Sequence, residues 1–484
     1  MILNRDSQLG FSSEERGMTR CNGKENQEQT DEATEKTGTE KKKSKAEKHV
    51  SFPPDEQIVS GFAELQHKNA DRCLTLTEVM AAYQQSCSKH QVQPNARVLE
   101  LLQQGACVGG SVKCLDLKGE RLEHRACEAL ETVLKWLHFD FISLQAAQLE
   151  ENGAASLLDM ILYYESTTHL DISDNSAMAT SGWRALAHLI KQSTRLSRLD
   201  VCNVALVDYP SQSLCKALAS SRLSALHLDN AKLSGLPLFT LVTALKSNGN
   251  LKELHLSHNQ LNSFQDSLQL GDLLRYNCTL RTLQLSHNFI SDAGLEELCD
   301  GLKWQVTGLK VLLLRNNKIT TKGMRHLAKA LPVIRGLQVL DLGENLLGNE
   351  GVHIIREPLM ANCSLLQLGL AQTAITCEGA VALAEVLAES RFLQTLDLSQ
   401  NQVRLGGLMA LCLALRINRS LGTLHVDQPP PTEQDKLLME TQISLRSEIT
   451  QRCLANASSS GFSSIPDSLT STDNTDHHDN SPTS

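Results

Sequence analysis

The chain has 484 residues and a formal net charge of −9, with 41% hydrophobic and 21% charged residues. These proportions are ordinary for a globular protein, and the negative balance gives no electrostatic case for nucleic acid or an anionic membrane as a partner. The low share of aromatic residues, 4%, indicates a core built on Leu and Ala.

The sequence shows no signal peptide and no membrane span. The N-terminus, MILNRDSQLGFSSEERG, lacks a basic region followed by an apolar run, and no apolar window of about eighteen residues occurs. The 14 Cys are scattered without a CxxC pair, which is typical of reduced and mostly buried thiols. We therefore expect a cytoplasmic or nuclear protein.

Residues 1–70 are polar and of mixed charge, and we expect a disordered arm because so few apolar residues cannot offset the entropy of ordering. Within this arm, Val50 and Phe52 stand two residues apart, which places them on one side of an extended chain. The preceding run KKKSK (Lys41–Lys45) can serve as a nuclear signal or as a merely charged, solvated segment.

Residues 71–110 are expected to form a helical cap. In LTLTEVMAAYQQSCSKHQ, Thr75 precedes Glu78 by three residues, the spacing of a capping box at a helix start. Repeat arrays need such capping elements at their ends.

Residues 111–430 repeat the pattern LxxLxLxxNxL. Clear copies start at Leu251, Leu280, Leu309, Leu337 and Leu393, and degenerate copies start at Val112, Phe139, Thr167, Leu196, Leu223, Leu365 and Leu421. The starts are 27–29 residues apart, which predicts about twelve units of one solenoid. Each unit combines a short alternating strand with a helix that is apolar at every third or fourth position.

This pattern resembles the leucine-rich repeats of the ribonuclease-inhibitor type. The resemblance implies an α/β horseshoe with a parallel sheet on its concave face and helices outside. The Asn at position nine is expected to bond exposed backbone and to form a ladder between units. The ladder should be interrupted where other residues replace Asn, at Ala147, Val204, Ala231, Thr373 and Pro429.

The chain after the repeats divides into two segments. Residues 431–457 follow the break at Pro429–Pro431 and predict a C-terminal helix over Glu433–Ala457. Residues 458–484 are rich in Ser, Thr and Asp and are expected to be a disordered tail.

No catalytic or nucleotide-binding motif occurs, so we expect neither an enzyme nor a cofactor. His227, His255, His258 and His287 fall at the fifth or eighth place of neighbouring repeats, where a metal site is conceivable. The sequence fixes no carboxylate or thiolate beside them, so we expect polar strand residues and no metal.

Acidic residues gather on the predicted concave face in the early and the late repeats. They can be a solvated polar surface or a patch that receives a second, basic protein partner. The candidates for this face are Asp116, Asp171, Asp200, His227, His255, Asp341 and Asp397.

The segment Lys48–Phe52 fits the docking pattern basic–x–Val/Ile–x–Phe/Trp, which resembles that of proteins that bind the catalytic subunit of type-1 protein phosphatase. Docking of this kind adds a strand to a sheet edge while alternate side chains enter apolar pockets. Ile58 and Val59 follow where such regulators often place a second hydrophobic pair.

The wider sequence is similar to a family of leucine-rich-repeat regulators of this phosphatase. The similarity lies in HVSFPPDEQIVSGF, TLTEVMAAYQQSC, CLDLKGERLEHRACEALETVLK, LLDMILYYESTTHLDIS and NEGVHIIREPL. It implies a noncatalytic, inhibitory subunit that docks through Lys48, Val50, Phe52, Ile58 and Val59. The family usually has Arg at the basic position, whereas this chain has Lys48 followed by His49.

Ser51 lies inside the docking pattern and is a hypothetical phosphosite. A phosphate there would bring about −1.5 to −2 charges into an apolar groove and release the phosphatase. Alternatively, Ser51 is simply a small strand residue that faces solvent.

Two rival functions remain open at this point. Ribonuclease-inhibitor-type repeats also occur in activators of the Ran GTPase, although those carry a long acidic tail that is missing here. A repeat scaffold without a phosphatase partner would show the same solenoid.

Overall fold

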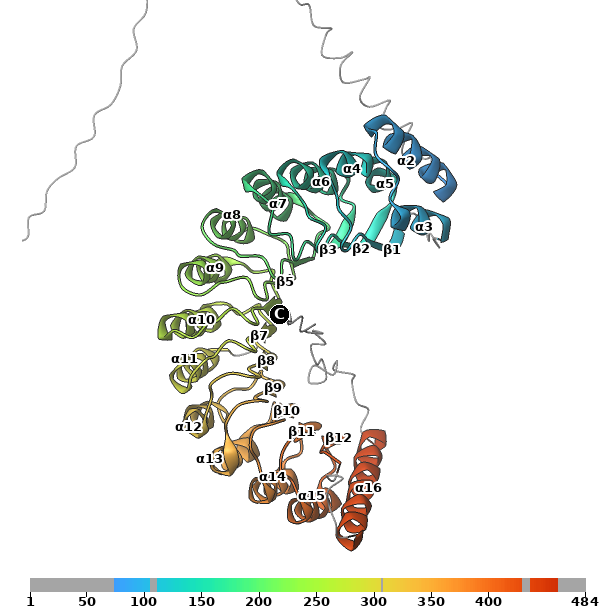
Figure 1. Ribbon diagram of the computed structural model, residues 1–484. Helices are drawn as coiled ribbons and strands as arrows, with labels where there is room; N and C mark the ends of the chain where they lie inside the picture. Colours follow the sequence, from blue (N-terminus) through green and yellow to red (C-terminus); the bar gives the residue numbers. More distant parts are fainter. Residues whose placement is uncertain (1–73, 105–110, 306–307, 429–435, 460–484) are drawn as a thin grey trace, which may run out of the picture. The chain divides into compact units, whose positions relative to one another are not determined.

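A computed structural model describes residues 74–104, 111–305, 308–428 and 436–459. In this part of the chain, twelve parallel strands form one sheet in strict chain order, and helices connect them (Figure 1). The predicted α/β repeat solenoid is therefore confirmed. The predictions for the arm and for the C-terminal tail fall outside the described residues.

Each strand lies at the start of one predicted repeat. The strands are β1 (Ser111–Asp116), β2 (His138–Ser143), β3 (Thr167–Asp171), β4 (Arg198–Asp200), β5 (Ala225–His227), β6 (Glu253–His255), β7 (Thr282–Gln284), β8 (Val311–Leu313), β9 (Val339–Asp341), β10 (Gln367–Gly369), β11 (Thr395–Asp397) and β12 (Thr423–His425).

The helices stand before, between and after these strands. They are α2 (Leu76–His90), α3 (Ala96–Gln104), α4 (His124–Ala129), α5 (Glu131–Trp136), α6 (Glu151–Tyr164), α7 (Thr180–Gln192), α8 (Tyr209–Leu218), α9 (Leu236–Ser247), α10 (Phe264–Tyr276), α11 (Asp292–Leu302), α12 (Thr321–Ala330), α13 (Gly348–Ala361), α14 (Cys377–Glu389), α15 (Leu405–Ile417) and α16 (Lys436–Ser459).

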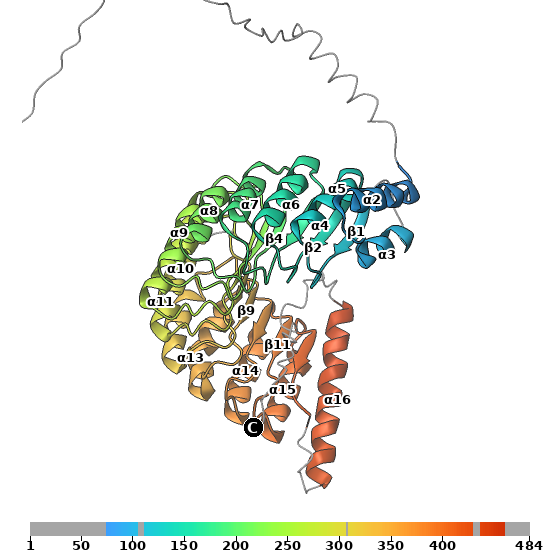
Figure 2. The same ribbon diagram turned by 45° about the horizontal axis from the view of Figure 1, so that its top comes forward.

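Alternation along each strand separates the core from the inner face of the solenoid. In β6, Leu254 and the following Leu256 are fully buried, whereas Glu253 and His255 are partly exposed. Leu residues at these buried places and the apolar faces of the helices form one continuous core. The sheet consequently lines the inner side of the repeat array, and the helices cover its outer side (Figures 1 and 2).

The ninth-position Asn residues form the expected ladder in the middle of the array. The backbone N–H groups of Asn259, Asn288 and Asn317 donate to the side-chain oxygen of the next Asn, at 2.7, 3.2 and 3.1 Å. Their own side-chain amides donate to nearby carbonyls, as Asn288 does to Leu256 at 2.8 Å. Thr373 stands at a ninth position without Asn, and its hydroxyl donates to the Leu370 carbonyl at 2.7 Å.

Glycines let neighbouring helices approach closely. A Cβ added to Gly271 of α10 would lie 2.6 Å from the backbone oxygen of Glu297 in α11, and one added to Gly294 would lie 2.5 Å from Ser267 Oγ. Such distances are far below van der Waals contact, so these positions require Gly to keep adjacent units in register.

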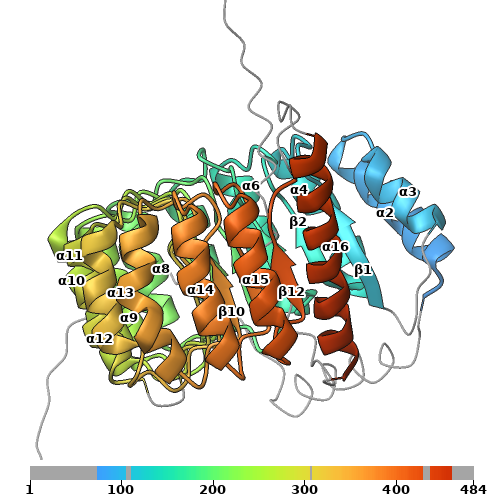
Figure 3. The same cartoon turned by 90° about the horizontal axis from the view of Figure 1, so that it is seen from below.

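Helices cover both ends of the described array. At the N-terminal end, Thr75 and Glu78 form the expected capping box, and α2 packs on α4 and α5. At the other end, α16 packs on α15 and β12 (Figure 3). Ile449 and Cys453 of α16 are buried there. The sequence predicts a helix over Glu433–Ala457, and α16 extends from Lys436 to Ser459.

The 11 cysteines among the described residues are unpaired. Burial raises the pKa of the Cys127 and Cys299 thiols to about 12, so these two thiols stay protonated and pack as small apolar groups. None of the described helices combines the length and the apolar character needed to cross a membrane.

Candidate functional site on the inner face of the sheet

The seven predicted inner-face residues fall in a single row across the sheet. Each occupies the fifth position of its repeat and is the last residue of its strand, and the strand register aligns them. In chain order the row is Asp116, Ser143, Asp171, Asp200, His227, His255, Gln284, Leu313, Asp341, Gly369, Asp397 and His425.

Four of these carboxylates serve the turn that ends their own strand. Each accepts a hydrogen bond from the backbone N–H two residues further on, at 2.8–2.9 Å. The residues are Asp116, Asp171, Asp341 and Asp397. Burial raises the pKa of Asp341, while the Gly343 amide and Arg315 oppose that shift. These Asp residues therefore have a local structural role, and their predicted role in partner binding stays a prediction.

Asp200 has a different environment, because it lies between two histidines and an arginine. His169 Nε2 is 2.7 Å from one carboxylate oxygen, and Arg198 Nε donates to the other at 3.0 Å. His227 Nδ1 lies 3.4 Å from Asp200 Oδ1 and 3.2 Å from Arg198 Nη2. The His169 ring also stacks on Phe141 at 4.2 Å between centroids.

Glu253 extends this arrangement into the next strand. Its Oε1 lies 3.2 Å from His227 Nε2 and 2.9 Å from His255 Nε2. The two imidazole rings stack at 3.8 Å with an interplanar angle of 8°. We call the set His169, Arg198, Asp200, His227, Glu253 and His255 the histidine–carboxylate network.

One prediction about the histidines is wrong. The histidines were expected to lack a fixed carboxylate, yet Glu253 contacts both His227 and His255. The reason is the repeat geometry: the third position of a unit shares a face with the fifth, and neighbouring strands lie about 4.8 Å apart. Glu253, His169 and Arg198 occupy third positions of their repeats, and the predicted inner-face residues, all at fifth positions, did not include them.

The two carboxylates of the network are held in their ionised form. Burial acts to raise the pKa of Asp200, but hydrogen bonds from His169 and Arg198 and the charges of His227 and Arg198 outweigh it, so that the pKa lies below its ordinary value. Hydrogen bonds from His227 and His255 lower the pKa of Glu253, against a smaller effect of burial.

We expect replacement of Asp200 by Asn to destabilise the array at neutral pH and to matter little in acid. Because the native pKa is lowered, the ionised carboxylate contributes stability above the ordinary pKa of about 4, and this contribution is lost as pH falls through the native pKa. Urea unfolding at pH 7 should show a loss of about 1–3 kcal/mol for Asp200→Asn. The difference in the free energy of unfolding between variant and wild type should shrink at pH 3. An equal difference at both pH values would contradict the stabilising role of the ionised carboxylate.

The other two histidines form a separate pair. His258 and His287 stack at 4.3 Å with an interplanar angle of 9°, at the eighth position of their repeats. The backbone is left-handed at both, with φ of 59°. They line a shallow groove of about 550 Å³ together with Asn203, Asn230, Gln260, Phe289 and Asn316.

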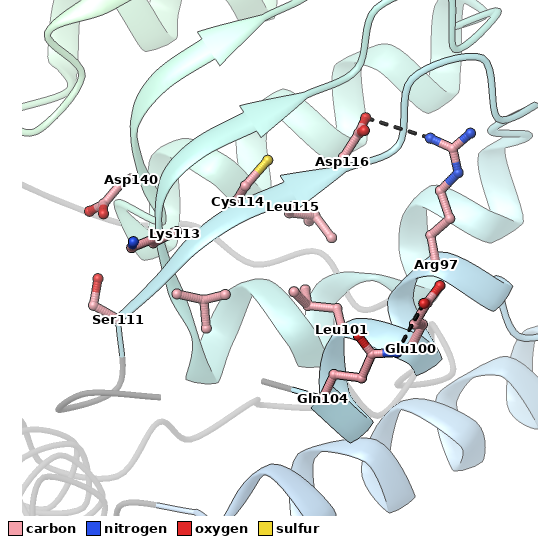
Figure 4. A pocket seen from close by; sticks show the side chains of 11 residues that line it. Arg97, Glu100, Leu101, Gln104, Ser111, Lys113, Cys114, Leu115, Asp116 and Asp140 are labelled. Carbon is pink, nitrogen blue, oxygen red and sulfur yellow. Dashed lines mark hydrogen bonds and ion pairs between the residues drawn. The ribbon is translucent and has the colours of Figure 1, made fainter. Parts of the chain in front are cut away.

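A second groove, of about 780 Å³, lies beside the first strand (Figure 4). Leu101, Val112 and Leu115 give it apolar walls between α3 and β1. At its rim Arg97 Nη1 lies 3.6 Å from Asp116. The ion pair adds a second local interaction to the turn that Asp116 already stabilises.

The predicted docking residues Lys48, Val50, Phe52, Ile58 and Val59, and the predicted phosphosite Ser51, all lie outside the described residues. Their roles therefore remain predictions from the sequence.

Comparison with known proteins agrees with the repeat architecture. Two leucine-rich-repeat family models match, one over residues 276–299 and 389–412 and the other over residues 250–273. Ribonuclease inhibitor of Sus scrofa is 28% identical over 250 residues, which cover 45% of this chain and 54% of that protein. With the sheet described above, these matches define the class: the chain is a leucine-rich-repeat protein.

A more specific similarity covers over half of the chain. Protein phosphatase 1 regulatory subunit 37 of Bos taurus is 46% identical over 290 residues, and its homologue in Caenorhabditis elegans is 33% identical over 296. The alignments cover 59% and 58% of this chain, but only 41% and 31% of those proteins. The chain is thus a homologue of protein phosphatase 1 regulatory subunit 37, and its matching part spans less than half the length of these relatives.

Proposed function

We propose that this protein is a noncatalytic regulatory subunit that binds the catalytic subunit of type-1 protein phosphatase. The observation that carries the proposal is the 46% identity with protein phosphatase 1 regulatory subunit 37 over 290 residues. Because the alignment covers 41% of that relative, the proposal concerns phosphatase binding and not every activity of the longer protein.

The segment around Val50 supplies a mechanism for this binding. An extended chain that adds to a sheet edge turns Val50 and Phe52 to the same side, into apolar pockets. Lys48 and the preceding lysines steer the segment toward an acidic rim, and Ile58 with Val59 adds a second apolar contact. Docking of this kind leaves the phosphatase active site open.

The repeat array gives the bound complex its selectivity in this proposal. Its inner face binds a second protein or restricts which phosphorylated substrates reach the phosphatase, and this restriction produces inhibition. Arrays of this kind offer an extended surface of which only a part is needed for one partner.

The direct test uses the full-length chain and the purified catalytic subunit. We expect a stable complex in size-exclusion chromatography, with slower dephosphorylation of a phosphoprotein and little change with a small phosphate ester. Absence of a complex would contradict the proposal and leave a repeat scaffold without this partner.

Phosphorylation of Ser51 is expected to weaken docking about 10- to 100-fold, since a charged phosphate would enter an apolar groove at a cost of at least 1–3 kcal/mol. Affinities of peptides spanning residues 41–62 for the catalytic subunit measure the effect. A peptide phosphorylated at Ser44, which lies before the docking segment, controls for charge alone. Equal weakening by both phosphates would contradict a specific regulatory role of Ser51. An unchanged affinity of the Ser51 phosphopeptide would contradict it as well.

A further inference from the structure

His227, Glu253 and His255 together have the composition of a transition-metal site. Their ligand atoms all lie within 4.8 Å of one another, and no other group of three or more His, Cys, Asp or Glu in the described residues meets that condition. Two imidazole nitrogens and one carboxylate oxygen suit zinc and its neighbours in the first transition row better than magnesium or calcium.

The fold brings these three side chains together in a simple way. Glu253 and His255 are two residues apart on β6, so both project from the same face of the sheet. His227 is the register partner of His255 on β5. The strands thus provide a rigid base, because the pairing of β5 with β6 fixes the spacing of the three backbone positions.

The present distances are close to those of a loaded site. Glu253 Oε1 is 3.2 Å from His227 Nε2 and 2.9 Å from His255 Nε2. Tetrahedral zinc with bonds of 2.0–2.1 Å separates its ligand atoms by about 3.3 Å. The two rings now stack nearly parallel, so at least one imidazole must rotate out of the stack before both Nε2 lone pairs point to one ion, which then replaces the hydrogen bonds that Glu253 accepts.

A neighbouring carboxylate can orient one of the ligands. Metal-bound histidines usually donate their second ring N–H to a carboxylate or carbonyl, which fixes the tautomer. Asp200 Oδ1 lies 3.4 Å from His227 Nδ1, the nitrogen opposite the one that faces Glu253. Arg198 Nη2 also lies 3.2 Å from His227 Nδ1. When that nitrogen carries a proton, Arg198 Nη2 can donate only to Asp200, to which it already donates at 3.2 Å.

We propose that His227, Glu253 and His255 bind a divalent transition-metal ion of the zinc type on the inner face of the array, with Asp200 as the positioning residue for His227. Three protein ligands leave a fourth position for water or for a side chain of a bound protein. The ion would join β5 to β6 independently of phosphatase docking, which involves a different part of the chain.

The test uses the full-length chain alone, stripped with a chelator and titrated with Co²⁺ and then with Zn²⁺. We expect one equivalent of Co²⁺ to give the visible absorption of a four-coordinate ion, and Zn²⁺ to displace it. Glu253→Gln and His255→Gln should each fail to bind this equivalent of Co²⁺ while retaining the wild-type circular dichroism spectrum. Asp200→Asn should bind about 10- to 100-fold more weakly, as removal of an orienting group typically does.

Two controls separate this site from other possible ligands. His258→Gln alters the neighbouring stacked pair and should still bind one equivalent of Co²⁺. Binding by the exposed Cys278 or Cys363 would appear as a thiolate-to-cobalt band in the near ultraviolet, and binding by His477 and His478 would persist in Glu253→Gln. Failure to bind Co²⁺, or binding that survives both Glu253→Gln and His255→Gln, would overturn the proposal.

Discussion

Replacing Val50 and Phe52 together by alanine is expected to lower affinity for type-1 phosphatase about 10²- to 10⁴-fold. Each side chain contributes roughly 1.5–3 kcal/mol when fully buried in an apolar pocket, so the pair accounts for about 3–6 kcal/mol. Isothermal titration of the full-length chain against the catalytic subunit measures the loss, which should appear mainly as faster dissociation.

Matched variants in the same arm make the result specific. Phe11→Ala removes an aromatic residue that lies outside the docking pattern, and it should leave the affinity unchanged. Ile58→Ala with Val59→Ala should give a smaller loss than the Val50 and Phe52 pair, since those two residues form the second contact. If Val50→Ala/Phe52→Ala binds as tightly as wild type, the docking segment is wrong, and binding, where it persists, resides in the repeats.

The repeat pattern predicted the architecture because one short rule recurs in every unit. Leu254 and Leu256 alternate with Glu253 and His255, and that alternation predicts which side chains face the main core. The fixed spacing then aligns equivalent positions on neighbouring strands, so that the sequence alone predicts His227 beside His255.

Contacts between side chains could not be obtained in the same way. Whether Glu253 turns toward His227 or toward solvent depends on its rotamer and its neighbours, which a repeat pattern does not specify. The hydrogen bond from Gly343 N–H to Asp341 likewise depends on the local turn at the strand end. The sequence therefore identified the face and its fifth-position acids and histidines, but neither the third-position residues Glu253, His169 and Arg198 nor the partners and burial of the side chains.

The second large effect is expected from Asn288→Ala in the ladder. Asn288 is fully buried, and its oxygen accepts from the Asn259 amide at 2.7 Å while its side-chain amide donates to the Leu256 carbonyl at 2.8 Å. Alanine removes these interactions from two buried backbone groups at about 1–3 kcal/mol each, so we expect a loss of about 2–6 kcal/mol in urea unfolding.

Thr373 suggests the matched variant, because it occupies the same repeat position and keeps a bond to the carbonyl three residues before it, Leu370, at 2.7 Å. Asn288→Thr can keep the equivalent bond to Leu285 and should lose less stability than Asn288→Ala. Hydrogen exchange locates the effect, since the Asn259 amide should exchange faster in both variants. Because each unit contacts only its neighbours, distant units should unfold nearly as in wild type. Uniformly faster exchange along the array would instead mean that the ladder makes the whole solenoid one cooperative unit.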